Sequence, residues 1–148
     1  MKVLDSVRMV LNEKGGQTWF IGPDATVYEA LELMADKGIG ALLVMKSNAP
    51  VGMISERDYA RKVILRGLSS KTTKVSEIMT SPALTIDMDT TVDDAMRLMT
   101  EHRLRHLPVM DGGGKIAGIV SIGDLVKWII TAHEQTIEQL ESYITGAR

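Results

Sequence analysis

Two short stretches of this chain share one pattern, and the pattern predicts a strand followed directly by a helix. Residues 52–58 read Gly-Met-Ile-Ser-Glu-Arg-Asp, and residues 118–124 read Gly-Ile-Val-Ser-Ile-Gly-Asp. In each, a small apolar run after a glycine predicts a short strand, and a serine three residues before an aspartate predicts the first turn of a helix. The chain is therefore expected to contain two strand-to-helix corners of the same construction.

The repeat extends upstream of both corners. Thr26-Val27 recurs as Thr91-Val92, and Val44 recurs as Val109. Each copy is predicted to run strand, helix, strand, strand, helix, and neither copy alone is large enough to bury a stable core. We therefore expect an α/β fold in which two β-α-β-β-α motifs pack together about a pseudo-two-fold axis.

Helical stripes and polar breaks divide the chain into five segments. Val3, Val7 and Val10 recur at helical spacing near the start, and Gly15-Gly16 ends that helix. A stretch rich in Ser and Thr after Gly67 is typical of a linker. The predicted segments are an N-terminal helix (1–16), a first motif (17–67), a linker (68–81), a second motif (82–133) and a C-terminal helix (134–148).

The C-terminal helix carries a short apolar stripe at Ile137, Leu140 and Ile144. A stripe of this length favours ordinary packing against the rest of the chain over a coiled coil. Contact with a second subunit is the alternative.

The composition excludes several classes of function. Hydrophobic residues make up 45% of the 148 residues, which suits a compact folded chain, and the net charge of −2 argues against nucleic acid as the main partner. The chain has no cysteine, so disulfides, thiolate nucleophiles and Cys-ligated metals are excluded. Since no apolar run approaches the roughly 18 residues of a membrane span, we expect no membrane partner and a cytoplasmic protein.

The Ser-x-x-Asp pattern at each corner has two interpretations. It is a capping box, in which the serine and the aspartate satisfy the unpaired N–H groups of the helix start without any ligand. A hydroxyl and a carboxylate at a helix start can also hold a phosphate and a sugar diol side by side. The residues alone leave both interpretations open.

The duplicated corners, with a Thr-Val-x-x-Ala helix upstream, resemble the cystathionine-β-synthase (CBS) domain, and two in tandem resemble a Bateman module. The resemblance runs from about Thr18 to Ile130. Residues 55–62, 77–80 and 103–109 are especially similar to small stand-alone CBS-pair proteins of bacteria and plant organelles. It implies binding of an adenosine-containing ligand (AMP, ADP, ATP, NAD or S-adenosylmethionine) in clefts between the paired motifs.

By position, Asp58 and Asp124 match the ribose-binding aspartates of that family, and Ser55 and Ser121 match a hydroxyl that meets phosphate or ribose. The chemistry fits, because a carboxylate can accept hydrogen bonds from both hydroxyls of a cis diol.

The two motifs differ at the positions that are expected to bind phosphate. Arg57 has Gly123 as its counterpart, and Arg105 with His106 replaces an uncharged pair in the first copy. Since a guanidinium binds phosphate with two hydrogen bonds, Arg57, Arg105 and His106 are the expected phosphate-binding residues, and the two sites are expected to be unequal. A solvated surface arginine is the alternative for either Arg.

The resemblance also implies a pocket for the base. Glycine would let a flat base approach the backbone, and small apolar side chains would form the walls, whereas a tight turn into a strand is the alternative. The hydroxyl of Thr90 matches a position near the ligand, and its counterpart Ala25 lacks one. The expected base-pocket residues are Ile39, Gly40, Ala41, Thr90, Ala95 and Leu104.

Other motifs do not predict catalysis or a metal site. His102 and His106 lack the surroundings of a zinc helix, and residues 112–115 lack the spacing of a P-loop and predict a hairpin turn. The basic run from Arg57 to Arg66 favours a solvated helix face over nucleic-acid contact. No nucleophile and base pair is recognisable, so an enzyme is not predicted.

We therefore expect a regulatory sensor, in which an adenine nucleotide or NAD shifts the population of a homodimer that an unidentified partner recognises. A ligand-free adaptor or dimerisation module is the first alternative. A nucleotide hydrolase is the second.

Overall fold

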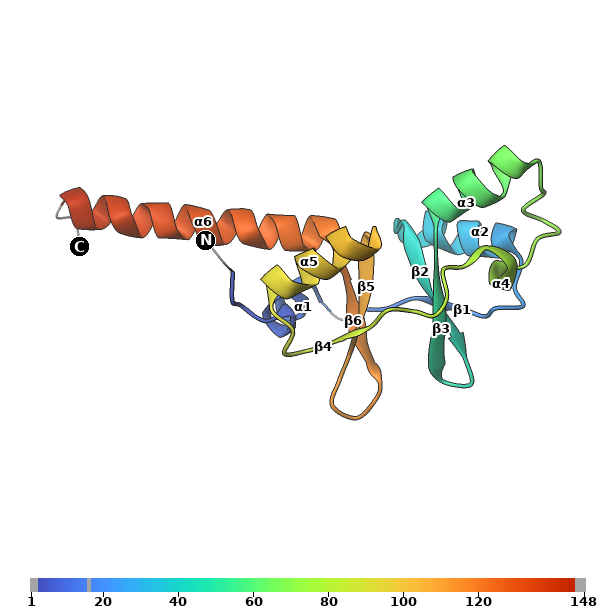
Figure 1. Ribbon diagram of the computed structural model, residues 1–148, viewed down its shortest axis with the longest axis horizontal. Helices are drawn as coiled ribbons and strands as arrows, with labels where there is room; N and C mark the ends of the chain where they lie inside the picture. Colours follow the sequence, from blue (N-terminus) through green and yellow to red (C-terminus); the bar gives the residue numbers. More distant parts are fainter. Residues whose placement is uncertain (1–2, 16, 146–148) are drawn as a thin grey trace. The chain divides into compact units, whose positions relative to one another are not determined.

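A computed structural model describes residues 3–15 and 17–145, which form two compact units (Figure 1). The first-motif unit comprises residues 17–84. The second-motif unit combines the N-terminal residues with residues 85–145. Each unit contains one three-stranded sheet and its own helices, which confirms the predicted α/β fold.

The first-motif unit follows the predicted order of elements. Its sheet has the order β1-β2-β3, with β1 parallel to β2 and β2 antiparallel to β3. Helix α2 begins at a capping box between Thr26 and Glu29, and it ends where Gly38 adopts a left-handed conformation with φ of 65°. The elements are β1 (Phe20–Ile21), α2 (Val27–Lys37), β2 (Ala41–Lys46), β3 (Ala49–Ser55), α3 (Glu56–Lys62), a 3₁₀ turn (Ile64–Arg66) and α4 (Val75–Ile78).

The core of this unit joins α2 to the hairpin of β2 and β3. Leu42, Val44 and Ile54 are fully buried, together with Val27 of α2. The backbone of residue 52 lies so close to Thr80 that only glycine fits there, because a Cβ atom would lie 2.7 Å from the backbone oxygen of Thr80. This packing fixes the end of β3, from which α3 starts.

The second-motif unit repeats the arrangement. Its sheet has the order β4-β5-β6, with β4 parallel to β5 and β5 antiparallel to β6. His106 pairs with Ser121 across β5 and β6, as Ala41 pairs with Ser55 in the first motif. The predicted hairpin lies between these strands, where Gly114 adopts a left-handed conformation with φ of 79°. The elements are α1 (Val7–Lys14), β4 (Ile86–Asp87), α5 (Val92–His102), β5 (His106–Met110), β6 (Ile116–Ser121) and α6 (Ile122–Thr145).

Helix α1 packs against the second motif. The backbone N–H of Val7 donates to the carbonyl of Thr90 at 2.8 Å, and the N–H of Val92 donates to the carbonyl of Asp5 at 2.8 Å. Leu11 packs so closely on β6 that a Cβ atom at Gly118 would lie 2.8 Å from its side chain. The N-terminal helix is therefore part of the second-motif unit.

The sequence predicted a separate helix from residue 134, but α6 continues through that residue. It runs without a break from the corner at Ile122 to Thr145, because the sequence has neither glycine nor proline between Gly123 and Gly146. The expectation of ordinary packing for the tail stripe is wrong within the described residues, since Ile137 is 54% exposed and Leu140 is 57% exposed.

Candidate functional site

The first corner places Ser55 and Asp58 in a capping box where β3 becomes α3. The hydroxyl of Ser55 accepts from the backbone N–H of Asp58 at 3.2 Å. Oδ2 of Asp58 accepts from the backbone N–H of Ser55 at 2.9 Å and from its hydroxyl at 3.1 Å. The two side chains predicted to meet a ligand therefore also satisfy the helix start.

A lysine outside the set of predicted site residues lies beside Asp58. Nζ of Lys62 lies 3.1 Å from Oδ1 of Asp58 and donates to the carbonyl of Ile78 at 2.9 Å. The spacing of four residues within one helix is a signal that could have found this pair. The first corner therefore combines a carboxylate that is 15% exposed with an ammonium group.

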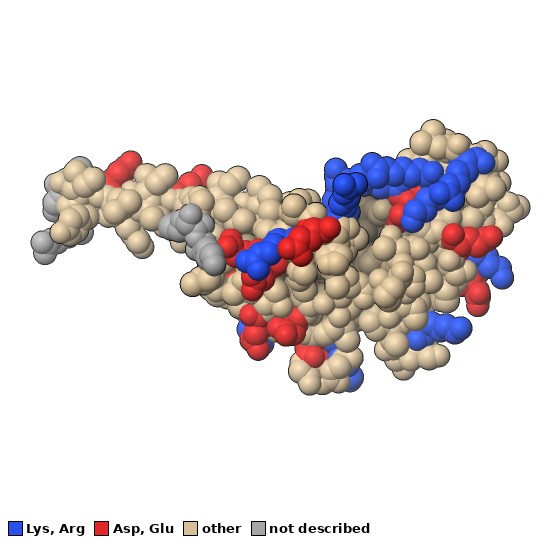
Figure 2. Space-filling model, viewed as in Figure 1, with Lys and Arg blue, Asp and Glu red and all other residues tan. Residues whose placement is uncertain are grey.

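The other basic side chains near this corner lie on the surface. Figure 2 shows Lys and Arg side chains gathered over α3. Arg57, Arg61 and Arg66 are exposed, as predicted for a solvated helix face, whereas Lys62 turns toward Asp58. Arg57, which is expected to bind phosphate, lies in the first turn of α3 next to Asp58.

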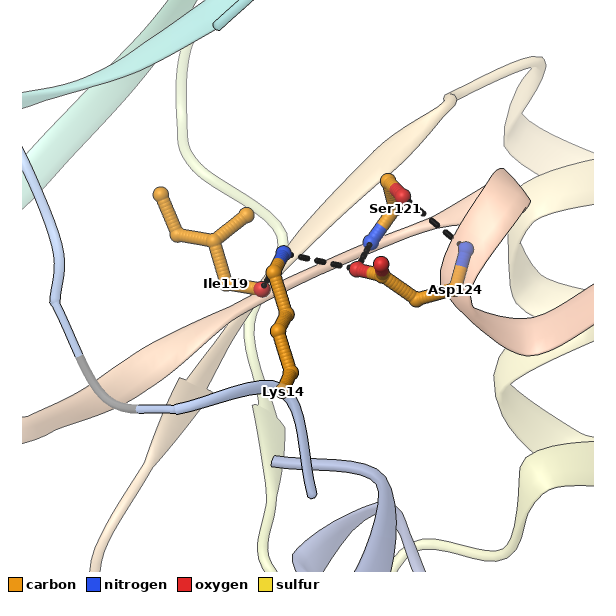
Figure 3. A network of polar contacts seen from close by, with 4 residues as sticks. All are labelled: Lys14, Ile119, Ser121 and Asp124. Carbon is orange, nitrogen blue, oxygen red and sulfur yellow. Dashed lines mark hydrogen bonds and ion pairs between the residues drawn. The ribbon is translucent and has the colours of Figure 1, made fainter. Parts of the chain in front are cut away.

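The second corner repeats the capping box where β6 becomes α6. Oδ2 of Asp124 accepts from the backbone N–H of Ser121 at 2.8 Å, and the hydroxyl of Ser121 accepts from the N–H of Asp124 at 3.1 Å. Nζ of Lys14 lies 2.7 Å from the same Oδ2 and donates to the carbonyl of Ile119 at 2.8 Å (Figure 3). Lys14 comes from α1, so a segment outside the repeat completes this corner.

These contacts keep Asp124 ionised. Burial alone would raise the pKa of the Asp124 carboxyl, but the hydrogen bond and charge of Lys14, with the N–H of Ser121, outweigh burial and lower the pKa below its usual value. At neutral pH the corner therefore presents a carboxylate beside an ammonium group.

The charged groups of the second corner change the pKa of His106. Burial lowers the pKa of His106, the positive charges of Lys14 and Arg105 lower it further, and Asp124 opposes them. The neutral imidazole therefore predominates at pH 7. In that form His106 can donate one hydrogen bond to a phosphate but adds no positive charge.

An open pocket of about 310 Å³ lies beside the first corner, between α2 and the start of α3. Ile39 and Gly40, two of the expected base-pocket residues, line it together with Glu56. The N–H of Glu56 donates to the carbonyl of Gly40 at 3.0 Å, which holds the glutamate at the pocket. A carboxylate here can accept from an amine and would repel a phosphate, so the pocket suits a base better than a phosphate group.

A second pocket, of about 330 Å³, lies between α1 and the first turns of α6. Lys14 and Asp124 form one side, and Lys127 with Trp128 forms another. The indole N–H of Trp128 donates to Oδ2 of Asp5 at 2.9 Å, which fixes the ring. This pocket contains both members of the Lys14–Asp124 pair.

Two of the expected base-pocket residues, Ala95 and Thr90, make contacts within the second-motif unit. Ala95 is completely buried in the core of the unit. The hydroxyl of Thr90 donates to Oδ1 of Asp87 at 3.3 Å, and its carbonyl meets the N–H of Val7 at the start of α1. Lys14 is at the other end of that helix, about 10 Å along its axis at 1.5 Å per residue. Thr90 therefore contacts the start of α1, whereas Asp124 contacts its end.

The remaining predicted residues lie at the start of the two inner strands. Ala41 is buried at the start of β2, opposite Ser55. Leu104 is half-buried, and Arg105 is exposed. The carbonyl of Arg105 accepts from the N–H of Ile122 at 2.8 Å, which repeats the contact between Gly40 and Glu56. Arg105 therefore reaches the second corner through its backbone.

Within residues 3–15 and 17–145, no three or more His, Asp or Glu side chains gather closely enough to hold a metal ion. None of the helices in this part of the chain is both long enough and apolar enough to cross a membrane.

Comparison with known proteins identifies the family of this chain. The family model of the CBS domain matches residues 18–65 and again residues 75–131. The mitochondrial CBS domain-containing protein CBSX3 of Arabidopsis thaliana is 42% identical over 146 residues, which covers 93% of this chain and 70% of that protein.

Two solved structures extend the comparison. A CBS-domain protein from Burkholderia ambifaria, proposed to act in signal transduction, is 48% identical with a TM-score of 0.81, and the match covers 85% of this chain and 94% of that one. A hexameric CBS-CP12 protein from bloom-forming cyanobacteria is 30% identical with a TM-score of 0.75, covering 85% of this chain and 68% of that one. This chain therefore belongs to the CBS-domain family as a tandem pair of CBS domains, a regulatory or signal-transduction module.

Proposed function

We propose that this module is a sensor that binds an adenosine-containing compound, AMP, ADP, ATP or NAD, and signals its presence to a partner protein. The observation that carries the proposal is the repeated pairing of a corner aspartate with a lysine, Asp58 with Lys62 and Asp124 with Lys14. A carboxylate accepts from the hydroxyls of a ribose, and a neighbouring ammonium group attracts a phosphate. Each corner therefore offers the two charges that a nucleotide needs.

The capping boxes are compatible with a ligand at the second corner. The hydrogen bonds that Asp124 accepts from Lys14 and from the backbone N–H of Ser121 both fall on Oδ2, so neither of them uses Oδ1. A ribose hydroxyl could donate to that oxygen without breaking the cap of α6. Capping and ligand binding are therefore compatible uses of the same side chain.

The two corners are proposed to differ in the chemical groups that each accepts from a ligand. Glu56 at the first corner has Ile122 as its counterpart, and Arg57 has Gly123. The first corner offers an acceptor for an amine on a base, whereas the second adds Lys14 from α1 and lacks the glutamate. We expect the second corner to tolerate phosphate charge better than the first corner does.

Signalling requires that a ligand favour one conformational state over another. A phosphate that competes with Asp124 for Lys14 would loosen one contact between α1 and its unit, so α1 is the proposed responding element. The responding species is proposed to be a homodimer in the cytoplasm, and the hexameric cyanobacterial relative supports self-assembly as a property that a CBS-pair protein can have.

A ligand-free adaptor is the competing function, and one observation favours it. Both aspartates already complete capping boxes, so each has a structural use without a ligand.

Differential scanning fluorimetry with AMP, ADP, ATP, NAD and S-adenosylmethionine separates the two functions. A ligand that binds only the folded state stabilises it by about 2.7 kcal/mol at a hundred times its Kd, which raises the melting temperature. The variants Asp58→Asn and Asp124→Asn retain an acceptor for the cap but lose the charge. Asp94→Asn is the matched control, since Asp94 occupies the equivalent position of the capped helix α5.

We expect at least one compound to raise the melting temperature of the wild type and of Asp94→Asn, with a smaller rise in a corner variant. If none of the five compounds changes the melting temperature, the sensor hypothesis is wrong and the adaptor hypothesis is favoured.

A further inference from the structure

Helix α6 carries a long exposed apolar stripe. Its members range from 37% exposed at Ile122 to 80% exposed at Ile144. Such a stripe on a surface helix normally faces a partner, because apolar side chains in water are unfavourable. The exposed apolar residues on this side of the helix are Ile122, Val126, Ile130, Ile137, Leu140 and Ile144.

The stripe is separate from the face that packs within the unit. Leu125 is completely buried, and Trp128 and Ala132 on the same side of α6 are half-buried. From Ile137 to Ile144 every side chain of the helix is exposed. In Figure 1, this part of α6 (orange to red) extends past α1 and α5 of its own unit. An isolated helical end of this kind is marginal in water and gains stability from a partner.

The spacing of the stripe is that of a coiled coil. From Val126 the intervals alternate between four and three residues when His133 is counted, which is the a and d pattern of a heptad. The a positions are all isoleucine, at 130, 137 and 144, and Leu140 occupies a d position. β-branched residues at a with leucine at d favour two parallel strands, and Leu140 meets this rule, whereas the other d positions are Val126 and His133.

His133 supports the same arrangement. It is the one polar side chain within the stripe, and its Nε2 atom is buried with no hydrogen-bond partner among the described residues. The protein's own fold covers that atom, so only the exposed part of the half-buried ring can face a second copy, and parallel pairing in register puts these two rings in one layer. Antiparallel pairing would instead place the imidazole against an isoleucine layer, because a positions pack against d positions in that arrangement.

The charges along α6 permit self-pairing. Glu134 occupies an e position, and in a parallel pair it faces g positions of the other helix, which are Ile129 and Thr136. No like charges therefore meet there. Residues 128–145 contain no Lys or Arg, so this surface would not be attracted to an anionic membrane.

We propose that residues 126–144 of α6 pair in parallel with the same residues of a second copy of this chain, forming a two-stranded coiled coil. The inference deepens the homodimer of the proposed function by naming its interface, and it is independent of ligand binding.

Cysteine cross-linking tests the direction and register of the pair. The chain has no cysteine, so Leu140→Cys introduces a single thiol at a d position, and Gln139→Cys places one at a c position, outside the a and d seam. Parallel pairing brings the two Leu140→Cys thiols together, and mild oxidation should join most chains into disulfide-linked dimers. Gln139→Cys should remain largely uncross-linked. Equal cross-linking of the two variants, or none in either, overturns the parallel coiled coil, whose a and d residues form the seam.

Light scattering after size-exclusion chromatography tests the interface separately. Ile137→Glu should halve the mass of the wild-type dimer, because it buries a charge in the seam, whereas Gln139→Glu adds the same charge outside it. Both residues are exposed in the chain, so neither change should impair folding, which circular dichroism checks. A wild-type monomer would overturn both the seam and the homodimer. A dimer that survives Ile137→Glu would overturn the seam alone.

Discussion

At the scale of single residues, the Lys14–Asp124 pair ties α1 to the second corner. Nζ of Lys14 and Oδ2 of Asp124 are 2.7 Å apart, and the Asp124 side chain is 24% exposed. Since the pKa of Asp124 is lowered in the folded protein, its ion pair stabilises the fold above the unfolded pKa of about 4. That stabilisation is lost as the pH falls through the lower, folded-state pKa.

Lys14→Met should therefore reduce the free energy of unfolding by about 1 kcal/mol at pH 7, the upper range for a partly exposed ion pair. The difference from wild type should shrink as the pH is lowered below about 4. Urea denaturation across a pH series measures it. Lys127→Met is the control, because Lys127 lines the same pocket without a salt bridge among the described residues. A difference that grows toward acid pH would contradict this account.

The two lysines also show what a sequence can and cannot predict about a site. Lys62 follows Asp58 by four residues on one helix, so helical spacing alone could have identified the pair. Lys14 precedes Asp124 by 110 residues and lies outside the repeat. Only the packing of α1 on β6 brings these residues together, and no local pattern in the sequence specifies that packing.

At the scale of elements, the order of strands and helices in the repeat follows from local features and is confirmed. Capping at Thr26 and Thr91 and glycine at Gly38 mark helix ends that any similar sequence would form. The extent of α6 was predicted less well. A boundary was expected at Glu134 because the repeat ends there, but the end of a repeat is not a helix-stopping signal.

The continuity of α6 can be tested at that residue. Proline is tolerated in the first turn of a new helix but costs about 3 kcal/mol in a helix interior, where it removes a hydrogen bond. Glu134→Pro should therefore lower the helical signal in far-UV circular dichroism by disrupting residues after the corner. Glu134→Ala should leave that signal unchanged or slightly raised. A Glu134→Pro spectrum equal to wild type would instead indicate that a separate helix begins near residue 134.

At the scale of the whole molecule, the two motifs are alike in fold and unlike in charge. Equivalent strands and helices carry the same Ser and Asp at each corner, yet one corner takes its lysine from its own helix and the other from α1. A duplicated fold can therefore present two chemically different sites. The lysine difference arises from a segment outside the repeat, so aligning the two copies shows the replacement of Arg57 by Gly123 but not the contribution of Lys14.

This asymmetry predicts how ligand binding should depend on phosphate. If Lys14 attracts the phosphates of a nucleotide at the second corner, Lys14→Met should weaken ATP binding by about tenfold, equivalent to about 1.4 kcal/mol, and weaken adenosine binding much less. Isothermal titration calorimetry with ATP, AMP and adenosine measures the three affinities. Asp124→Asn should weaken all three, because each carries the same ribose.

The control is Lys127→Met, which removes a charge from the same pocket while keeping the Lys14–Asp124 pair. It separates a contact made by Lys14 from a general loss of positive potential, because potential alone would affect both lysine variants similarly. An equal loss of affinity for ATP and adenosine in Lys14→Met would mean that Lys14 acts only by positioning Asp124. In that event the phosphate preference of the second corner would have to come from Arg105 or His106, the remaining polar side chains at the start of β5.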